Sequence, residues 1–194
     1  MRRFILSGFL SFSLLVLPAV AAETRNATAS SSEAEASRLD QLFADLKQER
    51  NEVAARRIAE RIREEWLASG GATADLLIEW ARNAAADEKY HVALDLLDET
   101  TTLYPEYVEG WNSRALVHLM MNDYSRAMVD LSRTLTIEPR HFGALSGLAG
   151  ILRATGREEQ ALEVYRRMLD IYPMQRSAQR ALIRLVEEQS DERL

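Results

Sequence analysis

The stretch that decides the fold is residues 108–141, VEGWNSRALVHLMMNDYSRAMVDLSRTLTIEPRH. Trp111, Ala115 and His118 are spaced i, i+4 and i+7, which places them on one face of a helix. An Asn-Asp pair then interrupts the apolar pattern, as a turn and a helix N-cap do. A second helix follows and ends before Pro139, because proline lacks an amide hydrogen and disfavours helix in the preceding residue. The stretch therefore predicts two antiparallel helices joined by a short turn.

This unit recurs along the chain at a fixed spacing. The markers are Ala81, Ala115 and Ala149 in the first helices, Ala93, Ala127 and Ala161 in the second helices, and Pro105, Pro139 and Pro173 after them. A small side chain where two helices cross allows them to approach closely. One hairpin cannot bury both of its faces, so a fixed period of this length predicts stacked hairpins in an all-α solenoid.

The pattern resembles the tetratricopeptide repeat (TPR). The residues that carry the resemblance in the middle unit are Trp111, Ala115, Tyr124, Ala127, Leu131 and Pro139. The next unit matches through Leu145, Leu148, Ala149, Gly156, Ala161, Tyr165 and Pro173, and the preceding one through Leu77, Ala81, Tyr90, Ala93, Leu97 and Pro105. Arg114 stands where leucine is usual. The resemblance implies a right-handed superhelix of three repeats, 74–107, 108–141 and 142–175.

Both flanks of the repeats have helical patterns. Residues 38–71 contain two apolar stripes, and Ala59 keeps the phase of the repeat, which predicts a diverged helical pair that acts as an N-terminal cap. Residues 176–189 form a further stripe among Arg and Glu residues. A terminal unit of a solenoid needs a polar outer face for solubility, so this segment is predicted to be a C-terminal capping helix.

The N-terminus has the plan of a secretory signal peptide. Residues 1–22 combine Arg2 and Arg3, an apolar run and a final stretch of small residues. Residues 23–37 contain no large apolar side chain and are expected to form a flexible tether. We therefore expect export to a bacterial periplasm, with no stable membrane anchor after signal cleavage. Bacterial origin is inferred from the signal and from the Ala- and Arg-rich, Lys-poor composition.

Composition excludes several classes of function. The chain has 24 basic and 30 acidic residues, which argues against nucleic-acid binding, and it has no cysteine. His91, His118 and His141 show no metal-ligand spacing with carboxylates, and no phosphate-binding loop or nucleophile elbow is present. We expect no metal and no cofactor. An enzyme with a site between repeats is a weak alternative, because no convergent acid–base set is found. His118 is expected to be a buried structural histidine.

The resemblance also implies a binding surface, because the first helix of each TPR lines a concave groove. Carried over by position, the groove residues are Asp75, Ile78, Glu79 and Arg82 in the first repeat, Glu109, Asn112, Ser113, Leu116 and Met120 in the second, and Gly143, Ser146, Gly147, Gly150 and Arg153 in the third.

Three features of this set bear on what the groove could bind. Glycine inside a helix costs about 0.5–1 kcal/mol relative to alanine, so three glycines on one helix indicate either a groove wall that a peptide approaches closely or tight helix packing. The family's lysine clamp for a C-terminal carboxylate is missing, although Arg82 and Arg153 are able to pair with an acidic ligand. Leu116 and Met120 offer an adaptable apolar strip, whereas Met121 is expected in the core.

These observations favour a non-catalytic scaffold that binds a peptide or a partner helix in the groove. The alternative is a subunit that docks into a larger envelope assembly through its convex face or the region of Trp66. The pattern specifies neither the partner nor the oligomeric state.

Overall fold

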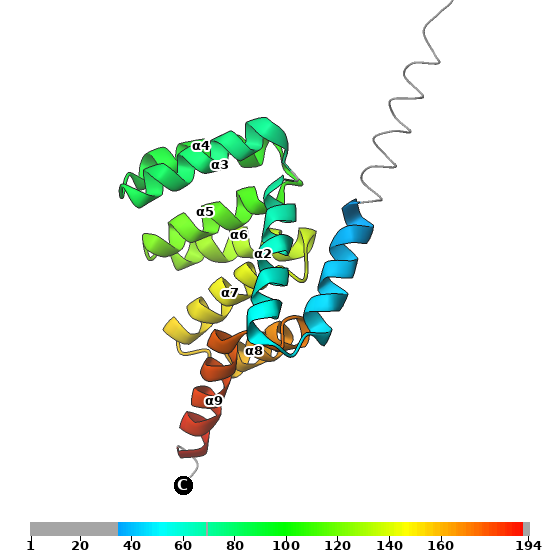
Figure 1. The fold of residues 1–194 in the computed structure, drawn as a ribbon. Helices are drawn as coiled ribbons and strands as arrows, with labels where there is room; N and C mark the ends of the chain where they lie inside the picture. Colours follow the sequence, from blue (N-terminus) through cyan, green and yellow to red (C-terminus); the bar gives the residue numbers. More distant parts are fainter. Residues whose placement is uncertain (1–34, 69, 192–194) are drawn as a thin grey trace, which may run out of the picture. The chain divides into compact units, whose positions relative to one another are not determined.

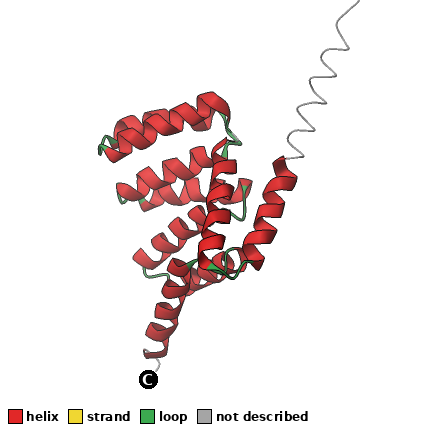
Figure 2. Cartoon of the chain, in the orientation of Figure 1, coloured by secondary structure: helices red, strands yellow, loops and turns green. Residues whose placement is uncertain are grey.

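Helices make up most of the part of the chain that the structure describes. The structure is a computed structural model, and it describes residues 35–68 and 70–191, in which short loops join the helices and no strand occurs (Figure 1, Figure 2). Residues 39–194 form one unit of the chain and residues 1–38 another. The predicted signal peptide and most of the predicted tether lie outside the described residues. The all-α class is confirmed.

The predicted repeats correspond to three pairs of packed helices. The pairs are α3 (Gly71–Ala86) with α4 (Tyr90–Leu103), α5 (Val108–Met120) with α6 (Tyr124–Ile137), and α7 (Phe142–Ala154) with α8 (Glu158–Ile171). A final helix, α9 (Arg176–Asp191), packs on α8. Each second helix ends shortly before Pro105, Pro139 or Pro173, as the missing amide hydrogen requires. The alanine markers at both crossing positions are buried in all three pairs.

The turn inside each hairpin also repeats. Glu88, Asn122 and Gly156 occupy the same position in successive repeats, and all three have a left-handed backbone, with φ of 59°, 57° and 70°. After each one, the next amide donates a hydrogen bond to a carbonyl near the end of the first helix, at 2.8 Å in every repeat. This bond is part of the Schellman motif, which satisfies the free carbonyls at a helix end. The motif sets a sharp turn between the two helices of each repeat.

Arg114, which departs from the family pattern, links two neighbouring repeats. Its guanidinium donates hydrogen bonds to Asp130 at 2.7 Å and to Asp98 at 2.6 Å, and lies 4.8 Å from the ring centre of Trp111. The pKa of Arg114 is raised, mainly by the hydrogen bond to Asp130. An ion pair here takes the place of the usual leucine.

The N-terminal helical pair consists of a helix over residues 35–48 and α2 (Glu52–Ala68). Figure 1 shows α2 running across the stacked hairpins rather than alongside them. Its buried side chains Ala55, Ala59, Ile62 and Trp66 share a core with residues of α5, α7, α8 and α9. The sequence predicts this pair as a cap before the first repeat. In the structure α2 lies instead over the N-terminal ends of α5, α7 and α9.

Candidate binding groove

Three residues with the repeat spacing bring α2 onto the first helices. Tyr107, His141 and Gln175 are each one repeat apart and immediately precede α5, α7 and α9. The Tyr107 hydroxyl donates a hydrogen bond to the carbonyl of Leu67 at 2.8 Å, and the His141 ring stacks on Trp66 with the ring centres 4.1 Å apart. Arg176, the residue after Gln175, donates a hydrogen bond to the side chain of Glu52 on α2 at 3.0 Å. One strip of the first-helix surface, which we name the covered strip, is therefore closed by α2 at residues 107–109, 141–142 and 175–176.

The covered strip contains a buried acid–histidine pair. Glu109 Oε1 lies 3.2 Å from His141 Nε2, and Glu109 Oε2 accepts a hydrogen bond from the Asn112 side chain at 2.9 Å. The other His141 nitrogen, Nδ1, accepts from the amide of Ala144 and so caps α7. Burial raises the pKa of Glu109, but the hydrogen bonds from His141 and Asn112 outweigh it and leave the pKa below its ordinary value. Glu109 is therefore an ionised structural group in the fold.

Aromatic rings fill the space between α2 and the repeats. The Trp66 ring lies 5.0 Å from that of Phe142 and 5.9 Å from that of Phe43, measured between ring centres. The guanidinium of Arg140 lies 4.1 Å over Phe43, and it pairs with Asp40 at 2.7 Å. Because Trp66 is only 3% exposed, its surface is not available to a partner in this arrangement. The Trp66 ring itself therefore gives no support to the alternative in which this region docks into an assembly, and that alternative stays a prediction.

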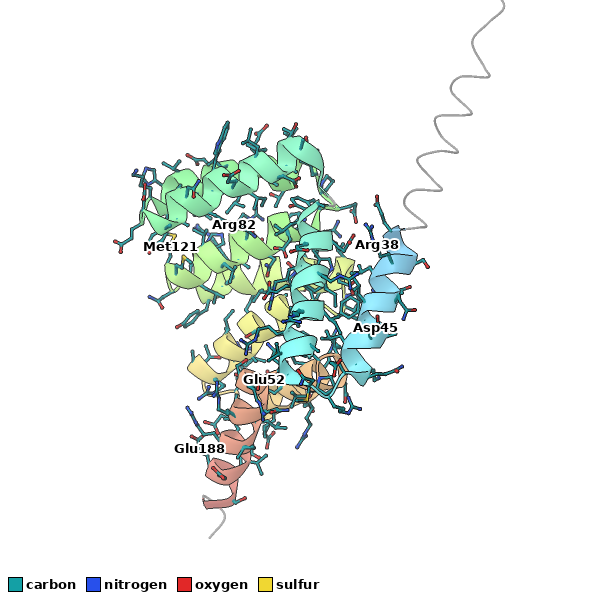
Figure 3. All side chains as sticks on the ribbon, viewed as in Figure 1. Arg38, Asp45, Glu52, Arg82, Met121 and Glu188 are labelled. Atoms are coloured by element: carbon teal, nitrogen blue, oxygen red, sulfur yellow. The ribbon has the colours of Figure 1, made fainter. Side chains whose placement is uncertain are left out.

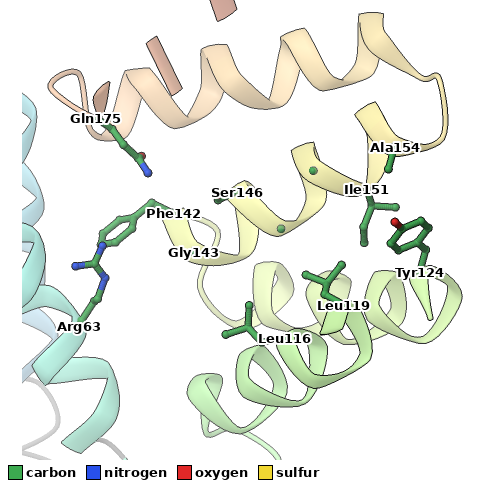
Figure 4. Close-up of a pocket in the computed structure, with 12 residues that line it drawn as sticks. Arg63, Leu116, Leu119, Tyr124, Phe142, Gly143, Ser146, Ile151, Ala154 and Gln175 are labelled. Atoms are coloured by element: carbon green, nitrogen blue, oxygen red, sulfur yellow. The ribbon is translucent and has the colours of Figure 1, made fainter. Parts of the chain in front are cut away.

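Beyond the covered strip, the first helices remain open. A cavity of about 550 Å³ lies between α5 and α7 (Figure 4). Its apolar wall comes from Leu116, Leu119, Tyr124 and Ile151, and its polar end from Arg63 and Gln175. The Oε1 atom of Gln175 is buried and accepts no hydrogen bond from the described residues.

The part of the first helices that α2 leaves uncovered is named the open strip. It continues toward the first repeat through two smaller cavities. One, of about 160 Å³, lies between α3 and α5 and is lined mainly by apolar side chains, with Leu116 and Met120 at its edge. The other, of about 470 Å³, lies between α2 and α3. Arg82 lines both cavities, is exposed, and forms no ion pair with the described residues (Figure 3). The open strip thus combines apolar walls with Arg82, which shares the cavity between α2 and α3 with the carboxylates of Asp75 and Glu79.

The residues predicted for the groove fall into three groups. Those that line an open cavity and are at least partly exposed are Asp75, Glu79, Arg82, Leu116, Met120, Gly143, Ser146, Gly147 and Gly150. Those whose side chains are buried are Ile78, Glu109, Asn112 and Ser113, although Ile78 and Ser113 still contribute to cavity walls. Arg153 lies in the last turn of α7, half-buried. The structure thus brings most of the predicted set to one open strip.

The glycines of α7 divide between the two interpretations that the sequence left open, tight helix packing and an open groove wall. A Cβ atom on Gly147 would lie 3.3 Å from both terminal carbons of Leu131, so this glycine permits tight packing of α7 on α6. A Cβ atom on Gly150 would meet nothing within 4 Å. Only Gly150 therefore leaves free space in the groove. Met121, expected in the core, is 44% exposed at the end of α5, so that prediction was wrong.

The three histidines lie in different surroundings. His118 is buried, as predicted, with Nε2 at 3.8 Å from Asp130 Oδ2, and His91 is exposed on α4. Among the described residues, no three His, Asp or Glu side chains come close enough together to hold a metal ion. In the same part of the chain, no helix combines the length and the apolar character needed to cross a membrane.

Sequence reasoning missed the residues that hold α2, although a signal for them was present. Tyr107, His141 and Gln175 keep the repeat period, and two of the three are aromatic rings at a position where the family pattern requires none. A recurring aromatic residue just before a helix indicates a shared contact. The sequence does not show what that contact is, because Trp66 and His141 are far apart along the chain.

Known proteins share this arrangement of repeats. The family model of the tetratricopeptide repeat matches residues 118–186. A TPR repeat-containing protein of Rhizobium etli is 46% identical over 168 residues, covering 87% of this chain and 80% of the relative. The chain belongs to the tetratricopeptide-repeat family.

Solved structures agree with this assignment at the level of the fold. The TPR domain of Sgt2 from Aspergillus fumigatus superposes with a TM-score of 0.58 at 18% identity, covering 63% of this chain and 83% of that domain. The first TPR domain of Spaghetti (RPAP3), solved with the HSP90 peptide SRMEEVD, superposes with a TM-score of 0.57 at 20% identity. It covers 60% of this chain and 95% of that structure. The likeness establishes the TPR solenoid.

Proposed function

We propose that this TPR protein is a non-catalytic scaffold that binds a peptide or a helix of a partner protein along the open strip. The observation that carries the proposal is the position of Leu116, which is exposed and yet lines the cavities on both sides of α5. An apolar side chain shared by two neighbouring cavities is suited to anchoring an extended or helical segment. The RPAP3 domain, a neighbour of the same fold, was solved with a peptide of HSP90, which supports this mode of binding.

The chemistry of the strip favours a ligand with apolar side chains and an acidic group. Leu116 and Met120 supply apolar contacts, and Met adapts to side chains of different shape. Arg82, exposed beside them without an ion pair to the described residues, is available for a bidentate hydrogen bond with a carboxylate. The preformed helices lower the ordering cost that binding would otherwise carry.

The test is photocrosslinking in the cell from a reactive group placed at position 116. We expect a partner protein to be captured from Leu116 and not from Ser132, which is exposed on α6 outside the cavities. Capture from Ser132 alone would contradict the groove and support the alternative, in which the convex face docks into a larger assembly. Mass spectrometry of the adduct identifies the partner in either case.

The scaffold is further proposed to act in a bacterial envelope after export. The basic, apolar and small-residue plan of residues 1–22 supports this location. N-terminal sequencing of the protein from an envelope extract checks it. The expected first residue is Ala22 or Glu23, and an intact Met1 would contradict export.

A further inference from the structure

The first repeat presents an apolar end surface that no described helix covers. Leu76 and Trp80 of α3 are 43% and 51% exposed. The residues one and two repeats after Leu76 are Gly110 and Ala144. Those one and two repeats after Trp80 are Arg114 and Leu148. Gly110 and Ala144 are buried, and Gly110 lies against Thr100 and Thr101 of α4 in the preceding repeat. Leu76 and Trp80 thus occupy positions that the rest of the solenoid uses to pack one repeat on another.

Helix α4 extends this surface with apolar and acidic side chains. In the second repeat, Arg126, Val129 and Asp130 of α6 line a cavity together with residues of α4, so these positions face the preceding repeat. Their counterparts in the first repeat are Val92, Asp95 and Leu96, and Glu99 follows one turn later on the same face. Asp95 and Glu99 are exposed and form no ion pair with the described residues. We name Leu76, Trp80, Val92, Leu96, Asp95 and Glu99 the first-repeat end.

The other end of the solenoid has an apolar surface with the opposite charge. Ile183 and Val186 of α9 are 57% and 45% exposed. Their counterparts Ala149 and Leu152 are buried in the third repeat, where a second helix follows. Arg180 and Arg184 flank Ile183, are exposed, and form no ion pair with the described residues. Glu187 lies one turn after Ile183 on the same face, so these three side chains together carry one net positive charge. We name Ile183, Val186, Arg180 and Arg184 the C-terminal end.

We propose that the C-terminal end of one copy of this protein docks on the first-repeat end of a second copy. Neither surface is covered by a described helix. Asp95 and Glu99 make the first-repeat end negative. By contrast, Arg180 and Arg184, with Glu187 beside them, leave the C-terminal end with a net positive charge. Two first-repeat ends brought together would place Asp95 and Glu99 against like charges, which disfavours a symmetric dimer. A contact between two different surfaces generates open chains or rings rather than closed pairs. The proposal is independent of what the open strip binds.

The experiment measures the mass of the purified protein in solution by sedimentation velocity as its concentration is raised. We expect association beyond the dimer, weakened by added salt because the paired charges are screened. Trp80→Glu blocks the first-repeat end of every copy, and Ile183→Glu blocks the C-terminal end, so each variant alone should be monomeric. Val129→Glu, at an exposed apolar residue of α6 outside both ends, should associate like the native protein.

Mixing the two blocked variants gives the decisive result. Trp80→Glu keeps an intact C-terminal end, and Ile183→Glu keeps an intact first-repeat end, so an equimolar mixture should form a one-to-one dimer and nothing larger. Circular dichroism verifies that both variants are folded. A native protein that stays monomeric, a mixture that stays monomeric, or a Trp80→Glu variant that still associates would each overturn the proposal. A monomeric native protein would leave the first-repeat end to a different partner.

Discussion

Two strips of the same first helices have opposite surroundings. At the N-terminal ends of α5 and α7, Glu109, His141 and Phe142 are buried beneath α2. About two to three turns further along, Leu116, Met120 and Gly150 remain exposed. The covered strip is filled by α2 through ring stacking and a backbone hydrogen bond, above a buried acid–histidine hydrogen bond. The open strip has cavities and an available arginine. Helix α2 therefore occupies one half of the concave surface, as a bound partner would, and leaves the other half open.

Removing the anchor of the covered strip should have the largest effect. Trp66→Ala deletes a ring that contacts Phe43, His141 and Phe142, and we expect a loss of about 3–5 kcal/mol in the free energy of unfolding. Trp80→Ala is the matched control, because Trp80 is half exposed and should change stability by only about 0.5 kcal/mol in dilute solution. Urea denaturation measures both. Equal losses would show that α2 is not anchored by Trp66.

The two interior glycines of α7 separate packing from binding. Gly147→Leu drives a side chain against Leu131 and should cost about 1–3 kcal/mol of stability. Gly150→Leu enters open space and replaces glycine with a better helix former, so it should not lower stability and should raise it by up to about 1 kcal/mol while filling the cavity between α5 and α7. Thermal unfolding and crosslinking from position 116 check the pair. A Gly150→Leu variant that unfolds, or that still captures the partner fully, would contradict the assignment of Gly147 to packing and of Gly150 to the groove.

The buried acid of the covered strip predicts a dependence of stability on pH. The folded pKa of Glu109 lies below its unfolded value of about 4.3, so its contribution is complete above that value and is lost as the pH falls through the folded pKa. Glu109→Gln keeps the shape, should cost about 1–3 kcal/mol at pH 7, and should make the acid loss of stability less steep. Unfolding free energies measured between pH 7 and acid pH test this. If the free energies of unfolding of the two proteins change in parallel with pH, the charge of Glu109 does not contribute to stability.

The smallest expected change is a gain in the free energy of unfolding from a substitution in the open strip. Gly150→Ala adds a methyl group in open space on a helix and should stabilise the fold by about 0.5–1 kcal/mol, because alanine is the better helix former. Gly147→Ala should fall short of this gain, since its methyl group meets Leu131 at 3.3 Å. Differential scanning calorimetry resolves the two. An equal gain at both positions would remove the packing explanation for Gly147.

Local rules predicted the repeats but not the place of α2. Pro139 and Ala127 constrain their own surroundings, so the helix end and the close crossing followed from the sequence. Ala59 keeps the repeat phase, yet α2 packs on α5, α7 and α9, because the partners of Trp66 are aromatic residues distant in sequence. The sequence likewise could not distinguish a packing glycine from a groove glycine on α7, because the distinction depends on the position of Leu131. Contacts between repeats and flanks depend on geometry that no local pattern encodes.

Thiol labelling of single-cysteine variants tests the division of the groove most directly, since the chain has no cysteine of its own. Val108 and Leu116 lie on the same helix, at 5% and 42% exposure. We predict that Leu116→Cys reacts rapidly and is protected by the captured partner. Val108→Cys should react slowly in the otherwise native protein and rapidly once Trp66→Ala is added. Similar rates at positions 108 and 116 in the otherwise native protein would contradict a covered strip beside an open one.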